Sequence, residues 1–192
     1  MSIKLLAAEL SRFLGSAEPE VLCITGKWGV GKTYAWNYYL KQAQESHNEK
    51  LAKYAYISLF GRNSLDDVRT AIVENTVNSR AAGEKPDLKS FKSVVSELAN
   101  LTGPFAKLAS FIPTAAGYVG SLNRALFLTV RDQIICIDDL ERMGSGLETM
   151  NVMGLVSSLK EEKFCKVVIL LNQDALSGTR KKDFEEHLVD RF

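Results

Sequence analysis

The sequence predicts an α/β fold of three layers, in which helices cover both faces of a mostly parallel central sheet. Three short runs are almost continuously apolar, VLCIT at 21–25, QIICID at 133–138 and KVVILLN at 166–172, and segments with helical periodicity separate them. Strands that are apolar on both faces and alternate with helices are typical of a parallel sheet buried between helices. At 192 residues, of which 46% are hydrophobic, the chain is long enough for one domain, 1–192, with a substantial core.

The first half of the chain alternates helices and strands. From the N-terminus, the predicted elements are a helix over about 3–14, the strand 21–25, a helix over 32–45, a strand over 54–60 and a helix over 65–78. The first helix has leucines at helical spacing, namely Leu6, Leu10 and Leu14. The last has Ser64 as its N-cap and Asp67 three residues on, which predicts a capping box.

The segment 81–129 follows neither pattern throughout and is expected to be a helical insertion between core elements. It contains one predicted helix over about 88–99, and Pro104 and Pro113 interrupt the rest. Regular order then returns. The last predicted elements are the strand 133–138, a helix over about 147–162, the strand 166–172 and a helix over 181–192.

Composition excludes several classes of protein. The net charge is +1 and the signs are mixed along the chain, so we expect no nucleic-acid surface spread over the domain. The three cysteines lie in apolar runs and are expected to be reduced, buried thiols, which favours the cytoplasm. The longest uncharged run, 108–123, is short and contains Pro113, Gly117 and Gly120. We therefore expect a packed loop-helix segment and no membrane association, with a hairpin that touches the membrane as the alternative.

The stretch GKWGVGKT at 26–33 matches the phosphate-loop pattern G-x-x-x-x-G-K-[ST] at every fixed position. A buried strand precedes it and a helical pattern follows, which is the context that the motif requires. Successive N–H groups of such a loop and the positive end of the helix surround an anion. Lys32 is expected to reach the β- and γ-phosphates, and the Thr33 hydroxyl suits Mg²⁺, which prefers oxygen ligands.

We expect contact with the nucleotide from eight residues of the loop and helix start: Gly26, Trp28, Gly29, Val30, Gly31, Lys32, Thr33 and Tyr34. Trp28 occupies a variable position at the loop apex. It is expected to pack on neighbouring structure rather than on the base.

Two carboxylates stand at the end of the strand 133–138, where parallel sheets place their ligand sites. Asp138 fits the residue that holds Mg²⁺, usually through water, and Asp139 fits the residue that orients or deprotonates the attacking water. Glu141 is expected either to assist Asp139 or to act only as an acid at the start of the next helix. Asn172 ends the next apolar strand, and either positions water beside the γ-phosphate or caps the strand.

These residues resemble the KAP family of P-loop NTPases, in the additional-strand class that also holds the AAA+ and STAND groups. The resemblance rests on the loop G-x-W-G-x-G-K-T at 26–33 and on DDLER at 138–142, close to the family's usual DDLDR. It implies an ATPase with Mg²⁺ that acts as a switch or motor module, with bacterial members often resembling parts of antiviral defence or membrane-associated signalling. Many members carry transmembrane helices between the two motifs, and the insertion here is too short for them.

The resemblance also implies a last core strand and a helical lid beyond Phe192. Both are absent from this sequence, so we expect either a truncated sequence or a minimal version of the domain. An arginine finger is expected from a neighbouring subunit or partner, with Arg191 as the first candidate and Arg142 as the second. The guanine-selecting N-K-x-D pattern is missing, which favours adenine.

Two other functions remain open. Asp139 replaces the glutamate common at its position, and together with the missing lid this favours a nucleotide-binding switch that hardly hydrolyses. A small-molecule kinase is the third alternative. Such kinases usually need a mobile lid with arginines; the sequence shows no lid pattern, and Arg62, Arg69 and Arg80 leave this alternative open.

Overall fold

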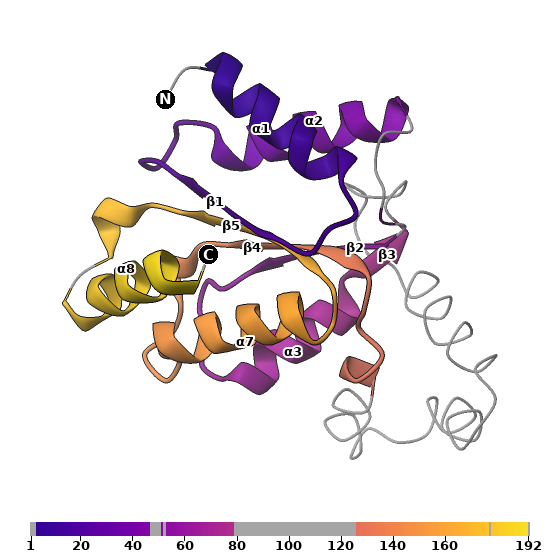
Figure 1. Ribbon diagram of the computed structural model, residues 1–192. Coiled ribbons are helices and arrows are strands. Elements are labelled where there is room, and N and C mark those ends of the chain that lie inside the picture. The colour runs from indigo at the N-terminus through magenta and orange to yellow at the C-terminus, as the bar shows by residue number, and fades with distance from the viewer. Residues whose placement is uncertain (1–2, 47–50, 52, 79–125, 177, 192) are drawn as a thin grey trace, which may run out of the picture.

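The computed structural model describes residues 3–46, 51, 53–78, 126–176 and 178–191 (Figure 1). Its described part contains a five-stranded sheet in the order β1-β5-β4-β2-β3. The strands are β1 (Val21–Thr25), β2 (Lys53–Ser58), β3 (Thr76–Asn78), β4 (Gln133–Asp138) and β5 (Lys166–Leu171). All neighbouring pairs are parallel except β2 with β3. The predicted α/β fold with a mostly parallel sheet is therefore confirmed.

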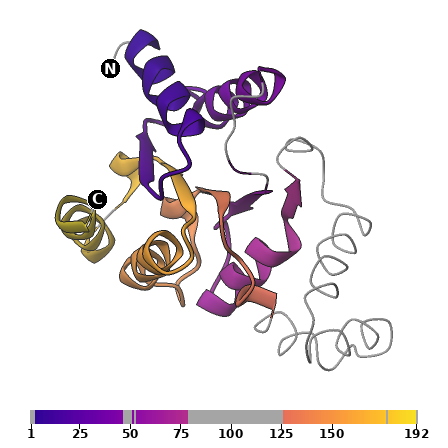
Figure 2. The same cartoon turned by 45° about the vertical axis from the view of Figure 1, so that its right-hand side comes forward.

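Helices cover both faces of this sheet, as Figures 1 and 2 show. The helices are α1 (Ile3–Gly15), α2 (Lys32–Glu45), α3 (Leu65–Glu74), α7 (Thr149–Glu161) and α8 (Thr179–Arg191), with short 3-10 turns η2 (Leu140–Arg142) and η3 (Gln173–Ala175). The first two helices lie on one face, and α3 and α7 lie on the other (Figure 1). Helix α8 packs against α7.

The core occupies both sides of the sheet because the central strands are buried on both faces. Along β4, Ile134 and Cys136 pack with residues of α1 and α2, whereas Ile135 and Ile137 pack with residues of α3 and α7. The indole Nε1 of Trp36 donates a 2.9 Å hydrogen bond to the Tyr54 hydroxyl and so ties α2 to β2. This packing fixes the carboxyl ends of the strands relative to α2.

The three thiols are free, as expected for reduced cysteines. Cys136 and Cys165 are buried, and burial raises the pKa of the partly buried Cys23 to about 12. At neutral pH, Cys23 is therefore a protonated thiol, which is a weak nucleophile.

Two elements differ from the sequence prediction by more than small shifts of one or two residues at their ends. Strand β2 ends at Ser58 rather than at 60, because the chain turns at Gly61, whose φ is +70°. The helix predicted over 65–78 ends at Glu74, and Thr76–Asn78 form β3 instead. The side chain of Asn75 donates to the carbonyl of Ala71, which caps the helix end, and pairing with β2 then favours the strand. The predicted capping box of Ser64 and Asp67 is present.

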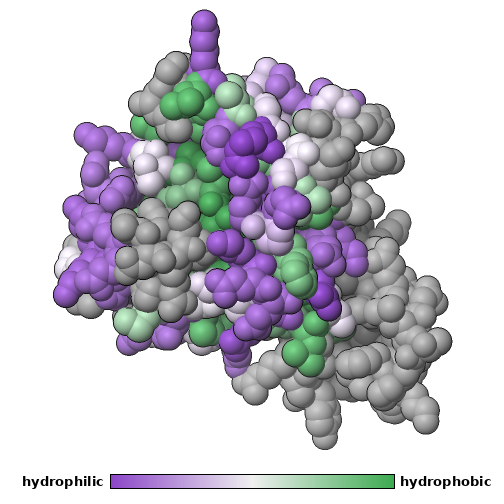
Figure 3. Space-filling model, viewed as in Figure 1, coloured by the Kyte–Doolittle hydropathy of each residue, from purple (hydrophilic) through white to green (hydrophobic). Residues whose placement is uncertain are grey.

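The predicted helix at 88–99 and most of the insertion lie outside the described residues. Where the chain re-enters the described part, Leu126 and Phe127 are buried in the core cluster on the α3 and α7 side. Among the described residues, no helix has both the length and the apolar character to cross a membrane. Hydrophilic residues predominate on the described part of the face in Figure 3, with a narrower hydrophobic strip in its upper half.

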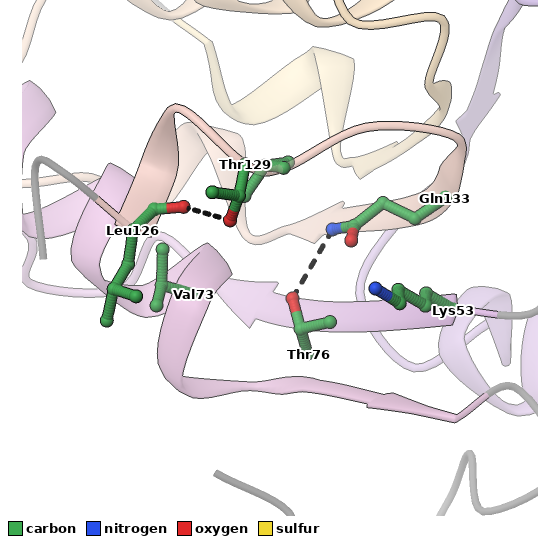
Figure 4. Close-up of a pocket in the computed structure, with 7 residues that line it drawn as sticks. Lys53, Val73, Thr76, Leu126, Thr129 and Gln133 are labelled. Carbon is green, nitrogen blue, oxygen red and sulfur yellow. Dashed lines mark hydrogen bonds between the residues drawn. The ribbon is translucent and has the colours of Figure 1, made fainter. Parts of the chain in front are cut away.

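A cavity lies at the amino ends of β2 and β4, at the opposite end of the strands from the phosphate loop (Figure 4). It is lined by Lys53, Val73, Thr76, Leu126, Thr129, Val130 and Gln133. The Gln133 amide donates to the Thr76 hydroxyl at 3.3 Å, and that hydroxyl donates to the carbonyl of Ile72. These polar groups hold β3 and β4 together, which is a structural role.

Candidate nucleotide-binding site

The phosphate loop connects β1 to α2 at the carboxyl edge of the sheet. The N–H of Gly26 donates to the carbonyl of Leu171 at 3.2 Å, so the loop starts against the neighbouring strand β5. Gly29 and Gly31 have φ values of +78° and +88°, a left-handed conformation that other residues adopt at a cost. At Gly26 the constraint is space instead, because an added Cβ would lie 3.0 Å from Val30 Cγ2.

Lys32 is the first residue of α2, and its side chain turns back over the loop. Its ammonium Nζ donates to the carbonyls of Gly26 at 2.8 Å and Lys27 at 3.2 Å. A positive charge therefore stands over the start of the loop, where it adds to the positive end of the helix. Val30 and Tyr34 are largely exposed beside this loop.

Asp138 ends β4, and the structure brings it against the start of α2. The Thr33 hydroxyl donates to Asp138 Oδ2 at 2.7 Å, and the Tyr56 hydroxyl donates to the same oxygen at 2.9 Å. The N–H of Asp139 donates to the other oxygen at 2.8 Å. Asp138 is only 6% exposed, so these donors replace the water that an ionised carboxylate needs.

Tyr56 keeps its proton in this arrangement. Burial, and next the negative charge of Asp138, raise the pKa of the Tyr56 phenol well above its ordinary value. The hydroxyl therefore stays a donor to Asp138 at neutral pH.

Asp139 adopts a left-handed conformation with φ +60° and turns toward β2. The Ser58 hydroxyl donates to its Oδ2 at 2.7 Å, and the guanidinium of Arg142 lies 3.5 Å from its Oδ1. The same guanidinium stacks over the ring of Phe60 at 4.2 Å. Both carboxylate oxygens of Asp139 are thus engaged by groups of β2 and η2.

Glu141 faces the phosphate loop. The indole Nε1 of Trp28 donates to Glu141 Oε1 at 2.7 Å, across 113 residues of sequence. The second oxygen, Oε2, is buried and has no hydrogen-bond partner among the described residues. Trp28 is 63% exposed, so the expectation that it packs on neighbouring structure is wrong for most of the ring. Only the indole N–H makes a hydrogen bond, the one to Glu141.

Asn172 follows β5, the strand that lies between β1 and β4, so it stands between the loop and Asp138. It is buried, and its Oδ1 has no hydrogen-bond partner in the part of the chain that the structure describes. A buried amide oxygen without a partner is costly, which points to a bound water or ligand group at this position.

Sequence reasoning missed two side chains of the site, Tyr56 and Ser58 of β2. They were detectable in principle: YAYIS alternates, so Tyr54, Tyr56 and Ser58 share one face of the strand. Which carboxylates they meet depends on the parallel register, in which Ser58 pairs with Asp138.

A phosphate loop after β1, a buried aspartate at the end of β4 and a third strand inserted between β1 and β4 define a P-loop NTPase domain of the additional-strand class. Comparison with protein families gives the particular family. The KAP family P-loop domain matches residues 3–117 of the 192, and the chain belongs to that family. Membership implies nucleotide binding. The matched region includes the phosphate loop and ends before Asp138, so the role of the acidic strand end rests on geometry. No curated protein matches the chain.

Proposed function

We propose that this domain binds ATP with Mg²⁺ and hydrolyses it, as a switch or motor module in a larger assembly. The observation that carries the proposal is the 2.7 Å contact between the Thr33 hydroxyl and the Asp138 carboxylate at the phosphate loop. Two oxygens this close are able to share one cation, and P-loop NTPases hold their Mg²⁺ with a hydroxyl and a strand-end aspartate.

The donor set fits Mg²⁺ rather than a softer metal. Thr33 and Asp138 supply oxygen ligands, and Mg²⁺ takes oxygen ligands and keeps several waters. When bound, the ion would neutralise charge on the phosphates. Tyr56 and the N–H of Asp139 orient the Asp138 carboxylate for that role.

The triphosphate would lie in the loop. Amides from Gly29 to Thr33 and the Lys32 ammonium are the donors, and Lys32 would exchange its carbonyl contacts in part for phosphate oxygens. We assign adenine as the base and propose that Tyr34, exposed at the third position of α2, lies beside the nucleotide.

Hydrolysis requires a carboxylate that directs water in line with the γ-phosphate. Asp139 and Glu141 are the two that follow Asp138, and the amide of Asn172 would hold the same water from the neighbouring strand. An arginine from a second copy or a partner protein would complete the site. Arg142 is bound to Asp139 in its own chain, and the Arg191 side chain lies outside the described residues. The proposed role in antiviral defence and the cytoplasmic location rest on the resemblance and composition alone.

A nucleotide-binding switch with little hydrolysis is the second candidate. It is favoured by the contacts of Asp139 with Ser58 and Arg142, which hold that carboxylate toward β2 and η2. Under this alternative, ATP binds and controls assembly, and phosphate release is negligible.

Nucleotide binding and phosphate release test the proposal together. Titrations with ATP, ADP and GTP, each with and without Mg²⁺, are expected to show Mg²⁺-dependent ATP binding that Lys32→Ala abolishes. The matched control is Lys41→Ala on the same helix, because Lys41 is exposed and contacts only Glu45 among the described groups. Binding without phosphate release at saturating ATP selects the switch. Equal ATP binding by the parent and Lys32→Ala rejects both candidates.

A further inference from the structure

We propose that Glu141 is the carboxylate that directs the attacking water, and that Trp28 is a positioning residue that holds it at the γ-phosphate end of the loop. The proposal rests on the ATP hydrolysis proposed above and names the acid that performs it. It follows from three observations: the position of the Lys32 ammonium, the hydrogen bond from Trp28 to Glu141, and the contacts of Asp139 with Ser58 and Arg142.

The position of the Lys32 ammonium indicates which end of the loop receives the γ-phosphate. In P-loop NTPases this lysine serves the β- and γ-phosphates. Here its Nζ lies at the carbonyls of Gly26 and Lys27, the first two residues of the loop. Trp28 is the next residue, so its backbone lies at the γ-phosphate end.

The indole of Trp28 has only one polar group, the Nε1–H, and that group is a donor. It donates to Glu141 Oε1 at 2.7 Å although the ring remains 63% exposed. Packing therefore does not explain the position of the ring, whereas the hydrogen bond does. The bond fixes the carboxylate against the loop and leaves Oε2 buried, with no partner in the described part of the chain. A carboxylate with one oxygen held and the other unpartnered is arranged to accept a hydrogen bond from a further group, and we assign that group as the attacking water.

Asp139, in contrast, has contacts at both oxygens and is held toward β2. Its Oδ2 accepts from Ser58 and its Oδ1 pairs with Arg142, and its left-handed φ of +60° directs it to β2. Asp139 therefore fixes the turn between β4 and η2, and that turn brings Glu141 to the loop.

The reaction balances with these groups. Glu141 Oε2 accepts a proton as the water oxygen forms its bond to the γ-phosphorus. The bond from that phosphorus to the bridging oxygen breaks, and ADP leaves with the electron pair. The products are ADP, inorganic phosphate and the proton, which Glu141 returns to solvent.

The hydrogen bond is tested first in the protein without nucleotide. The ¹H–¹⁵N indole resonance of Trp28 is assigned by its loss in Trp28→Phe, since Trp36 is the other tryptophan. Glu141→Gln is expected to shift this resonance, because an amide oxygen is a weaker acceptor than a carboxylate. Glu45→Gln, on the exposed side of α2, is the matched control and is expected to leave it in place. An indole resonance unmoved by Glu141→Gln overturns the proposal.

Kinetics then test the assigned roles. General-base catalysis contributes about 10²–10⁴-fold, so Glu141→Gln is expected to lower kcat about 100-fold, and Trp28→Phe about tenfold. Affinity for ATP should change less than about twofold in both. In the double variant, Trp28→Phe should add no further loss, because its effect passes through Glu141. Trp28→Tyr, which also lacks the indole N–H, is the second variant. Tyr38→Phe, which removes one polar group from another exposed aromatic, is the control.

The outcomes separate this proposal from the function on which it rests. A parent protein that releases no phosphate rejects the hydrolysis and this assignment with it. If the parent hydrolyses ATP and Lys32→Ala does not, the proposed function stands. In that case, two results would overturn the roles assigned to Glu141 and Trp28 without affecting the proposed function. One is a kcat equal to that of the parent in both Trp28→Phe and Trp28→Tyr. The other is a larger loss of kcat in Asp139→Asn than in Glu141→Gln.

Discussion

Thr33 and Asp138 are 105 residues apart in sequence, yet their side-chain oxygens lie 2.7 Å apart. A hydroxyl donating to a buried carboxylate is a stable arrangement without metal, and the same two oxygens are suitably placed to bind a cation when the donor proton is redirected. The metal site at this edge of the sheet is thus preorganised by two residues and by the Tyr56 donor behind them.

Asp138→Asn tests that arrangement. The amide keeps an oxygen that accepts from Thr33 or Tyr56, but it removes the negative charge that attracts Mg²⁺. We expect ATP affinity in the presence of Mg²⁺ to fall at least about tenfold. Affinity without Mg²⁺ should change much less. Calorimetric titration of ATP with Mg²⁺ and with a chelator measures both.

Asp132→Asn is the matched control for this change. Asp132 directly precedes β4, so the control makes the same Asp-to-Asn change at the other end of that strand. Asp132 has a left-handed φ of +48°, which asparagine also tolerates. Its ATP affinity is expected to equal that of the parent. An Asp138→Asn protein that keeps the full Mg²⁺ effect would remove Asp138 from the metal site.

At the scale of the element, the phosphate loop depends on a left-handed residue at its junction with α2. Gly31 is the N-cap of α2, with φ +88° and ψ +25°, and an alanine Cβ there would meet no atom within 4 Å. The cost of Gly31→Ala is therefore conformational rather than steric, roughly 1–2 kcal/mol of unfolding free energy. Urea denaturation monitored by circular dichroism measures it.

Gly154 provides the opposite case. It lies inside α7, and a Cβ added there would also meet open space. Because alanine favours a helix interior, Gly154→Ala is expected to stabilise the protein by roughly 0.5–1 kcal/mol. The two alanine substitutions should thus have opposite signs. A Gly31→Ala protein as stable as the parent would show that the loop relaxes to another backbone conformation, and a destabilised Gly154→Ala protein would contradict the expectation for α7.

Local signals predicted most of these elements. β1, α2 and β4 have the bounds that the sequence predicts, since a short apolar run or a glycine-rich loop marks each end. β3 was missed because Thr76–Asn78 become a strand only by pairing with β2, more than twenty residues earlier. The insertion at 81–129 remains a prediction for the most part, because residues 79–125 lie outside the described part.

In the candidate site too, local motifs were predictable and contacts between distant segments were not. The phosphate loop and Asp138 are contiguous motifs, so the sequence was sufficient to propose them. The different directions of Asp139 and Glu141 depend on a left-handed φ at Asp139 and on contacts with Ser58 and Trp28, which are distant in sequence. No local pattern contains that information.

At the scale of the whole molecule, strand order brings the site together. β5 lies between β1 and β4, so the ends of three strands, and with them Gly26, Asn172 and Asp138, converge at one edge. At the opposite end of β5, hydrogen bonds of Lys166 hold the strand to the segment after α1. Lys166 has a fully buried side chain, and its Nζ donates to the carbonyl of Ser16 at 2.8 Å and to Glu20 Oε1 at 2.9 Å. These bonds attach the segment after α1 to β5.

Glu20→Gln tests the contribution of the Glu20–Lys166 contact through the pH dependence of the free energy of unfolding. Burial raises the pKa of Glu20, but hydrogen bonds from Arg12 and Lys166 outweigh it and hold the pKa below its ordinary value. A carboxyl group with a lowered pKa stabilises the fold above its unfolded-state pKa, and that contribution is lost as pH falls through the folded-state value. Hydrogen bonds to charged groups contribute about 1.5–3 kcal/mol, so a loss of that order is expected for Glu20→Gln at pH 7.

The free energy of unfolding in urea, measured from pH 7 to pH 3, provides the readout. The parent should lose stability on acidification below about pH 4.5, the ordinary pKa of a glutamate. Glu20→Gln should start lower and lose less over the same interval, because it has no proton to bind at this position. Glu45→Gln, whose carboxylate is exposed and only 3.8 Å from Lys41, should reproduce the parent curve. Parallel curves for the parent and Glu20→Gln would show that the anchor of α1 does not depend on the ionisation of Glu20, and that packing of Leu10, Phe13 and Leu14 alone holds the helix to the sheet.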